Sequence, residues 1–120
     1  MDVVNRNSVE AFITKDTSEV REILAPGNSS LRIQSLAEAR VAPGGSTQEH
    51  FHPKAEEIYY VLEGGGLISI DGEEREIGPG DGIAILPGSR HKVWNTGQAD
   101  LVILCCCSPA YGHDDTIITE

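Results

Sequence analysis

Basic residues are scarce in this chain. Its 120 residues include nine Lys or Arg against nineteen Asp or Glu, which gives a formal net charge of -10 at pH 7. A surface of this sign repels phosphate backbones and anionic lipid headgroups, because like charges oppose association. We therefore expect neither nucleic acid nor a membrane as a partner.

Long apolar runs are also missing. No stretch approaches the roughly 20 apolar residues that a membrane-spanning helix needs. The first residues lack the charged segment followed by an apolar segment that is typical of a secretory signal. These absences predict a cytoplasmic protein.

Cysteine occurs in a single block, Cys105, Cys106 and Cys107. Adjacent cysteines form only strained disulfides, and the chain has no distant cysteine to pair with them. In the apolar run "LVILCCC" we expect three reduced thiols that pack as small apolar residues of a last core strand.

Aromatic residues make up only 5% of the chain, whereas it has 13 Gly and 6 Pro. This composition favours many short strands joined by tight turns over a helical bundle. At this length one all-β domain is expected, a sandwich or a small barrel. Strands are predicted at residues 31–42, 46–52, 56–63, 66–71, 73–77, 82–86, 90–95 and 99–107, with a tight hairpin turn at Asp71-Gly72.

The two ends of the chain are less regular than its centre. Residues 1–30 are expected to form an arm packed on the barrel or on a partner subunit, with "SEVREIL" as a short helix or an edge strand. Residues 31–107 form the predicted core. Residues 108–120 are expected to be an extended tail, in which His113 is solvated.

The stretch "EHFHPKAEE", residues 49–57, concentrates two of the four histidines and several carboxylates. Residues i and i+2 of a strand point to one face, so His50 and His52 can direct their rings at one point. A turn at Pro53 would return a carboxylate to them. Alternation slightly favours Glu56, which shares its face with apolar residues, over Glu57.

His91 follows the turn at Pro87-Gly88 and is expected to face the same interior from the opposite sheet. Three imidazoles and one carboxylate suit a divalent transition metal such as Fe, Mn, Zn or Ni. The spacing therefore predicts a mononuclear metal site with one ion per chain.

These residues resemble the two motifs of the cupin superfamily. Gly44, His50, His52, Glu57 and Gly64 match the first motif, whose spacing after the carboxylate selects Glu57 over Glu56. Gly80, Gly88, His91 and Asn95 match the second motif, except that Leu86 stands where the motif has proline and Pro87 follows one place later.

The resemblance covers residues 44–95 by motif and about 31–107 with the flanking strands. It implies a double-stranded β-helix, a jelly-roll-like barrel, that holds a metal through His50, His52, Glu57 and His91. It also makes a homodimer the expected assembly. Four protein ligands leave an octahedral ion two open positions for a small oxygenated substrate.

Further residues are candidates for contacts with that substrate. Ser46 and Gln48 share strand parity with His50, and Tyr59 shares it with Glu57, so we expect all three to point inward, with Gln48 and Tyr59 touching the substrate. Arg40 and Arg90 are the nearest cations, and a surface position is expected for both.

Two classes of function follow from such a site. An enzyme would be a dioxygenase if the metal is Fe(II), or an isomerase, epimerase or lyase of a sugar or hydroxy acid if it is Mn, Zn or Ni. The alternative is a non-catalytic barrel that binds a small molecule such as a sugar, or that is purely structural.

Overall fold

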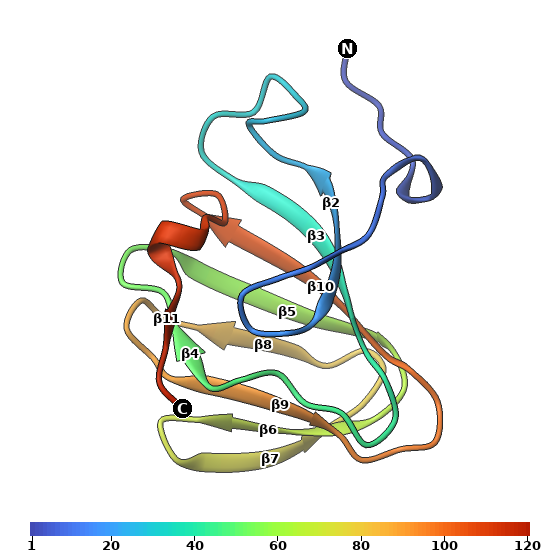
Figure 1. Cartoon of the computed structure of the whole chain (residues 1–120), viewed down its shortest axis with the longest axis vertical. Coiled ribbons are helices and arrows are strands. Elements are labelled where there is room, and N and C mark those ends of the chain that lie inside the picture. The colour runs from blue at the N-terminus through green and yellow to red at the C-terminus, as the bar shows by residue number, and fades with distance from the viewer.

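Two antiparallel sheets face each other in the computed structural model, which describes all residues from 1 to 120 (Figure 1). The larger sheet has the order β1-β2-β3-β10-β5-β8, with bounds Phe12–Ile13, Glu19–Leu24, Ser35–Val41, Leu101–Ser108, Glu56–Glu63 and Gly82–Ile85. The smaller sheet has the order β11-β4-β9-β6-β7, with bounds Ile117–Ile118, His50–Phe51, His91–Asn95, Gly66–Ile70 and Glu73–Ile77. This is the predicted double-stranded β-helix.

Most of the predicted strands are confirmed, two of them with the expected bounds, at 56–63 and 73–77. The Asp71-Gly72 turn is also confirmed, since both residues have positive φ, 49° and 86°, as a tight hairpin requires. The prediction for 46–52 is wrong in extent, because only His50–Phe51 is a strand. Residues 42–49 approach it as an irregular segment with a single bridge from Ser46 to Trp94.

The hydrophobic core lies between the two sheets. Val61 and Leu101 are completely buried, and the cluster around them comprises Val41, Tyr59, Ile68, Ile77, Ile85, Val93 and Ile103. Asn95 closes the end of this core, where its side-chain amide donates to the carbonyls of Val41 and Ala99. The motif asparagine therefore has a structural role, as an ordinary turn residue would.

Strand β5 shows which of its faces is inside. Glu57, Tyr59 and Val61 are buried, whereas Ile58 and Tyr60 are 55% and 44% exposed. The alternation that favoured Glu56 was therefore misleading, because the outer face of this strand is as apolar as its inner face.

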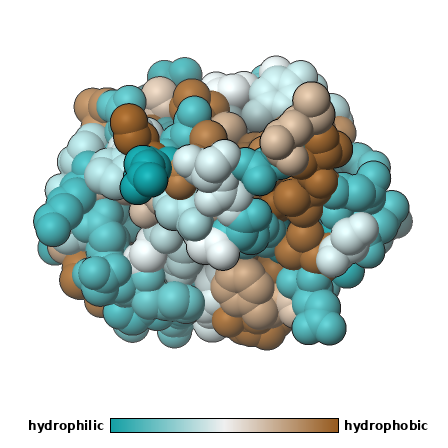
Figure 2. All heavy atoms as spheres, turned by 90° about the horizontal axis from the view of Figure 1, so that it is seen from above, coloured by the Kyte–Doolittle hydropathy of each residue, from teal (hydrophilic) through white to brown (hydrophobic).

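The outward side chains Ile58, Tyr60 and Leu62 form an exposed apolar row on the larger sheet. The end of the molecule seen down the long axis is mostly hydrophilic, with a continuous strip of apolar groups on one side of it (Figure 2). The structure contains one chain, so the homodimer stays a prediction.

Both ends of the chain add strands to the barrel. The segment "SEVREIL" forms β2, which pairs with β3, so its strand alternative was the right one. The arm is also held by an ion pair between Arg6 and Glu38, 2.8 Å apart. The tail ends in β11, which pairs with β4. No helix of the structure has the length and apolar character needed to cross a membrane.

Candidate metal centre

His50 and His91 come together through strand pairing. They are direct partners across the antiparallel strands β4 and β9, and their ring centroids lie 4.2 Å apart. Opposed residues on neighbouring strands place their side chains side by side on one face. His91 therefore lies on the same sheet as His50, and the expectation that it would come from the opposite sheet is wrong. The opposite sheet contributes Glu57 instead.

His52 lies just beyond the end of β4 and completes the cluster. One nitrogen from each of His50, His52 and His91 lies within 4.8 Å of the other two, and all three residues are buried. The i and i+2 argument for His50 and His52 therefore holds, even though the regular strand ends between them.

The outer nitrogens of the three rings all contact backbone carbonyls. Nδ1 of His50 is 2.8 Å from the Gln48 carbonyl, Nδ1 of His91 is 2.9 Å from that of Ser89, and Nδ1 of His52 is 3.0 Å from that of Asp115. A carbonyl only accepts, so each Nδ1 must carry the donated proton. In a neutral ring this leaves the lone pair on Nε2, which points into the cluster as a metal ligand requires.

Glu57 faces this cluster with one oxygen. Its Oε1 lies 3.4 Å from Nε2 of both His52 and His91. Its Oε2 accepts a 3.0 Å hydrogen bond from the thiol of Cys107, its direct partner on β10. Glu57 Oε1 and His91 Nε2 have no hydrogen-bond partner although they are buried. Acceptors that face one another in this way need a cation between them, so the residues present fit a divalent ion.

The pKa values of these groups are shifted by their burial and by their short distances from one another. Burial raises the pKa of Glu57, but His52 and His91 outweigh burial and bring it down to about 2. The pKa of His50 is lowered, chiefly by burial and then by the neighbouring His91. Burial lowers the pKa of His52, but Glu57 and Asp115 outweigh burial and raise it. Glu57 as a carboxylate and His50 as a neutral imidazole are in the protonation states that bind a metal ion.

None of the three cysteines forms a disulfide, as expected, but two of them also contribute to the site. Cys107 is buried, and its donation to Glu57 leaves Oε1 of that carboxylate free to face the histidines. Burial raises the pKa of both Cys105 and Cys107, so both remain thiols. Cys105 lines the cavity beside the metal donors, whereas Cys106 does not.

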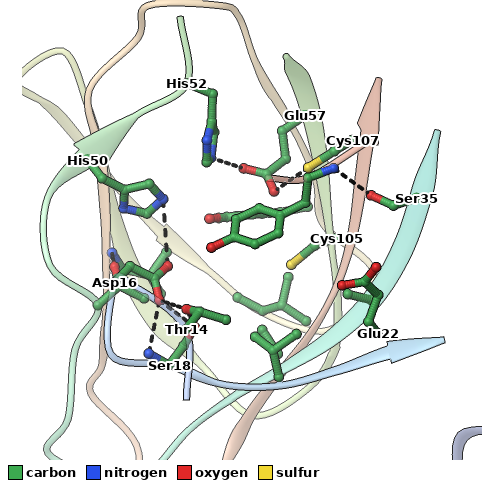
Figure 3. A pocket seen from close by; sticks show the side chains of 18 of the residues that line it. Thr14, Asp16, Ser18, Glu22, Ser35, His50, His52, Glu57, Cys105 and Cys107 are labelled. Carbon is green, nitrogen blue, oxygen red and sulfur yellow. Dashed lines mark hydrogen bonds and ion pairs between the residues drawn. The ribbon is translucent and has the colours of Figure 1, made fainter. Parts of the chain in front are cut away.

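A cavity opens next to the cluster, and the centre of a water molecule can reach about 50 Å³ of it. Figure 3 shows His50, His52 and Glu57 on one side of it and Glu22 on the opposite side. Its apolar wall is formed by Val20, Ala37, Ala39, Val41, Val93 and Ile103. No Lys or Arg lines it, and Arg40 and Arg90 lie outside it as expected. Arg40 pairs instead with Glu38 and Asp100.

The predicted substrate contacts have different outcomes. Tyr59 lines the cavity with its ring 5.8 Å from that of His91, and burial raises the pKa of its hydroxyl, which stays protonated. Gln48 and Ser46 do not line the cavity, whereas Thr47 does. The prediction for Gln48 failed because parity holds only along a regular strand, and the chain is irregular before His50. Thr47 is held by its hydroxyl, which accepts from the Val93 amide.

The sequence did not identify the contributions of the two chain ends. The arm supplies Thr14, Asp16 and Ser18 to the cavity, and the tail supplies Tyr111. The pattern Asp-x-Ser at 16–18 is typical of a turn, but it does not indicate where in the fold that turn lies. His113 is exposed as predicted.

The tail also supports the loop between His52 and Glu57. The carboxylate of Asp115 accepts from the amides of Lys54 and Ala55, both at 3.0 Å, while its carbonyl contacts His52. Two donors of the loop thus depend on one side chain.

Asp115→Ala should lower both the stability and the metal affinity of the protein. Leaving two loop amides without their acceptor should cost about 1 to 3 kcal/mol of unfolding free energy. Because the loop orients His52, metal affinity should fall about tenfold or more. Urea denaturation and metal titration measure the two effects. The control is Asp114→Ala, at an exposed neighbour; equal behaviour of the two variants would contradict the assigned role.

The cupin domain family matches residues 37–107, which are more than half of the chain and include the three clustered histidines and Glu57. This chain belongs to the cupin family. An uncharacterized protein of Methanocaldococcus jannaschii is 47% identical over 114 residues, which cover 95% of this cupin and 91% of that protein.

Two crystal structures are similar to this cupin. A predicted oxalate decarboxylase of Thermotoga maritima has a TM-score of 0.79 and 25% identity, over 90% of this chain and 99% of that one. The polyketide cyclase RemF of Streptomyces resistomycificus has a TM-score of 0.79 and 29% identity, over 90% of this chain and 79% of that one. Enzymes thus occur among its structural neighbours.

Proposed function

We propose that this cupin is a metal-dependent enzyme that acts on an uncharged, largely apolar substrate through a carbonyl or enol oxygen. The observation that carries this proposal is the placement of three converging imidazole nitrogens and an unpartnered carboxylate oxygen on the wall of a mostly apolar cavity. Donors of this kind suit a divalent transition metal.

The charges in the cavity restrict the substrate. Asp16, Glu22 and Glu57 line it, and no Lys or Arg does. A divalent ion would be largely neutralised by the two carboxylates beside the histidines, Asp16 and Glu57, so little attraction would remain for an anion. An anion would lose its hydration without a compensating cation, which is costly. Dicarboxylates, sugar acids and phosphorylated sugars are therefore poorer fits than a neutral ketone or phenol.

The residues around the metal donors have distinct roles in this proposal. A bound divalent ion would supply Lewis-acid polarisation of the substrate oxygen. Tyr59 stays protonated at neutral pH and can donate a hydrogen bond to a second oxygen. The Val and Ala side chains of β2, β3 and β9 exclude water from the remainder of the substrate. Such a site suits isomerisation, cyclisation or dehydration next to a carbonyl.

The similarity to a polyketide cyclase supports a largely apolar substrate, because polyketides are oxygenated compounds with large apolar parts. The similarity to a predicted oxalate decarboxylase points to an anionic substrate instead. We favour the former because the cavity has apolar walls and no cation. The two readings predict opposite binding preferences.

Substrate preference can be tested with a matched pair of ligands. 2-Acetylnaphthalene and 2-naphthoate share one ring system but differ in charge. Isothermal titration of the metal-loaded protein should show at least about tenfold tighter binding of the neutral ketone, equivalent to about 1.4 kcal/mol. Tighter binding of the carboxylate would overturn the proposed substrate class.

Catalysis can be tested in the same system before the natural substrate is known. The metal-loaded protein should accelerate exchange of the acetyl protons of 2-acetylnaphthalene with deuterium from the solvent, as followed by NMR. Protein from which a chelator has removed the metal should not accelerate this exchange. Neutral-ligand binding without metal-dependent exchange would instead support the non-catalytic binding barrel.

A further inference from the structure

Asp16 brings a second carboxylate to the histidine cluster from outside the cupin motifs. It lies in the loop between β1 and β2, and its side chain is 13% exposed. Its Oδ2 is 3.6 Å from Nε2 of His50 (Figure 3). Glu57 makes its corresponding contacts with His52 and His91, so the two carboxylates flank different members of the cluster.

The two oxygens of Asp16 are used differently. Oδ1 accepts from the Thr14 hydroxyl at 2.5 Å, the Ser18 hydroxyl at 2.6 Å and the Ser18 amide at 2.9 Å. Oδ2 has no hydrogen-bond donor in the protein, and its close contact is with His50. Three donors on one oxygen hold the carboxylate rigidly, and its second oxygen is directed at the cluster.

The backbone of Gln48 links Asp16 to His50. Its amide donates to the Asp16 carbonyl at 2.8 Å, and its carbonyl contacts Nδ1 of His50 at 2.8 Å. The single N–H of the neutral His50 ring therefore lies on Nδ1, and Nε2 directs its lone pair at Oδ2 of Asp16. Two acceptors thus face each other across 3.6 Å, the same arrangement that surrounds Glu57.

We propose that Asp16 is a second carboxylate ligand of the metal centre and binds the divalent ion together with the three histidines and Glu57. This inference rests on the metal site of the proposed function. Two carboxylates balance the charge of a divalent ion, which fits the absence of a cation from the cavity. Five protein ligands leave an octahedral ion one open position. That position suffices for one substrate oxygen but does not allow a substrate and O₂ to bind side by side.

Under this proposal, the N-terminal arm supplies one of the metal ligands. Motif spacing locates ligands only within residues 44–95, and Asp16 lies well before that range. The segment that brings it is held by β2 pairing with β3 and by the Gln48 amide. The metal centre is therefore assembled from the arm and the barrel together.

The assignment of Asp16 as a ligand is tested by metal titration of protein from which a chelator has first removed any metal. Zn²⁺ is titrated by calorimetry, and Co²⁺ by its visible absorption, whose intensity and position depend on coordination number. Asp16→Asn keeps an oxygen for the Thr14 and Ser18 donors but removes the charge. It should weaken Zn²⁺ binding at least about tenfold, as losses around metal ligands commonly do. It should also change the Co²⁺ spectrum.

Glu22→Gln is the matched control, since Glu22 lines the same cavity without contacting a histidine. It should bind both ions as the wild type does. Circular dichroism establishes that each variant is folded. If Asp16→Asn does not fold, Asp16→Ser replaces it, because a serine hydroxyl can still accept from the Ser18 amide.

Three outcomes are distinguishable. Weaker Zn²⁺ binding and an altered Co²⁺ spectrum in the Asp16 variant alone support the proposal. Wild-type affinity and an unchanged spectrum in that variant overturn the Asp16 assignment but leave the metal centre standing. Failure of the wild type to bind either ion overturns the metal centre and the Asp16 assignment together.

Discussion

His91→Ala is expected to abolish tight metal binding while the barrel remains folded. His91 is 1% exposed, its Nε2 has no hydrogen-bond partner, and its Nδ1 donates to the Ser89 carbonyl. Removal of this ring deletes one of three convergent donors. The hydrophobic core around Val61 and Leu101 does not include it, so folding should not depend on the ion. His50→Ala should have the same effect.

Metal content by elemental mass spectrometry, on protein purified without chelator and under anaerobic conditions, measures this effect. Circular dichroism reports the fold in parallel. His113→Ala is the matched control, because it removes an exposed imidazole and should leave the metal content at the wild-type level. Full metal occupancy in both His50→Ala and His91→Ala would refute the ligand assignment.

Gly64→Ala is expected to destabilise the fold severely. Gly64 has a φ of +80°, and a Cβ placed there would lie 2.4 Å from the Asp100 carbonyl oxygen and 3.0 Å from Cα of Leu101. Positive φ costs a side-chain-bearing residue about 1 to 2 kcal/mol, and overpacking against fixed atoms adds about 1 to 3 kcal/mol. A loss of about 3 kcal/mol would remove a large part of the unfolding free energy of a small domain.

Gly80→Ala separates the two contributions. Gly80 also has positive φ, +90°, but a Cβ there would meet nothing within 4 Å. This control should therefore lose only the conformational part, about 1 to 2 kcal/mol. Denaturant unfolding of both variants gives the comparison. Equal losses would show that the close approach of Gly64 to Asp100 has no energetic importance.

The carboxylate beside the histidines shows where local pattern reasoning failed. Alternation favoured Glu56 because Ile58 and Tyr60 share its face, yet that face is solvent-exposed. An apolar face indicates the core only when the other face is polar, and β5 is apolar on both. Motif spacing pointed to Glu57 because it counts six residues between the carboxylate and Gly64, which follows the strand, and does not depend on which face is apolar.

Gln48 and Thr47 show a second kind of failure. Parity counting requires a continuous strand, because one irregular residue moves every side chain before it to the other face. The strand begins only at His50, so Thr47 lines the cavity and Gln48 acts through its peptide.

The sequence by itself determined the all-β architecture and the hairpin at Asp71-Gly72, because these depend on short-range periodicity and turn chemistry. It assigned the three histidines to one site through the spacing of the two motifs. Only the tertiary structure decided that His91 pairs with His50 on one sheet, that Cys107 holds Glu57, and that Asp16 and Asp115 come from the two chain ends to the same site. Contacts between residues 30 to 70 positions apart are set by sheet pairing and by the burial of both ends against the barrel, and no local pattern encodes them.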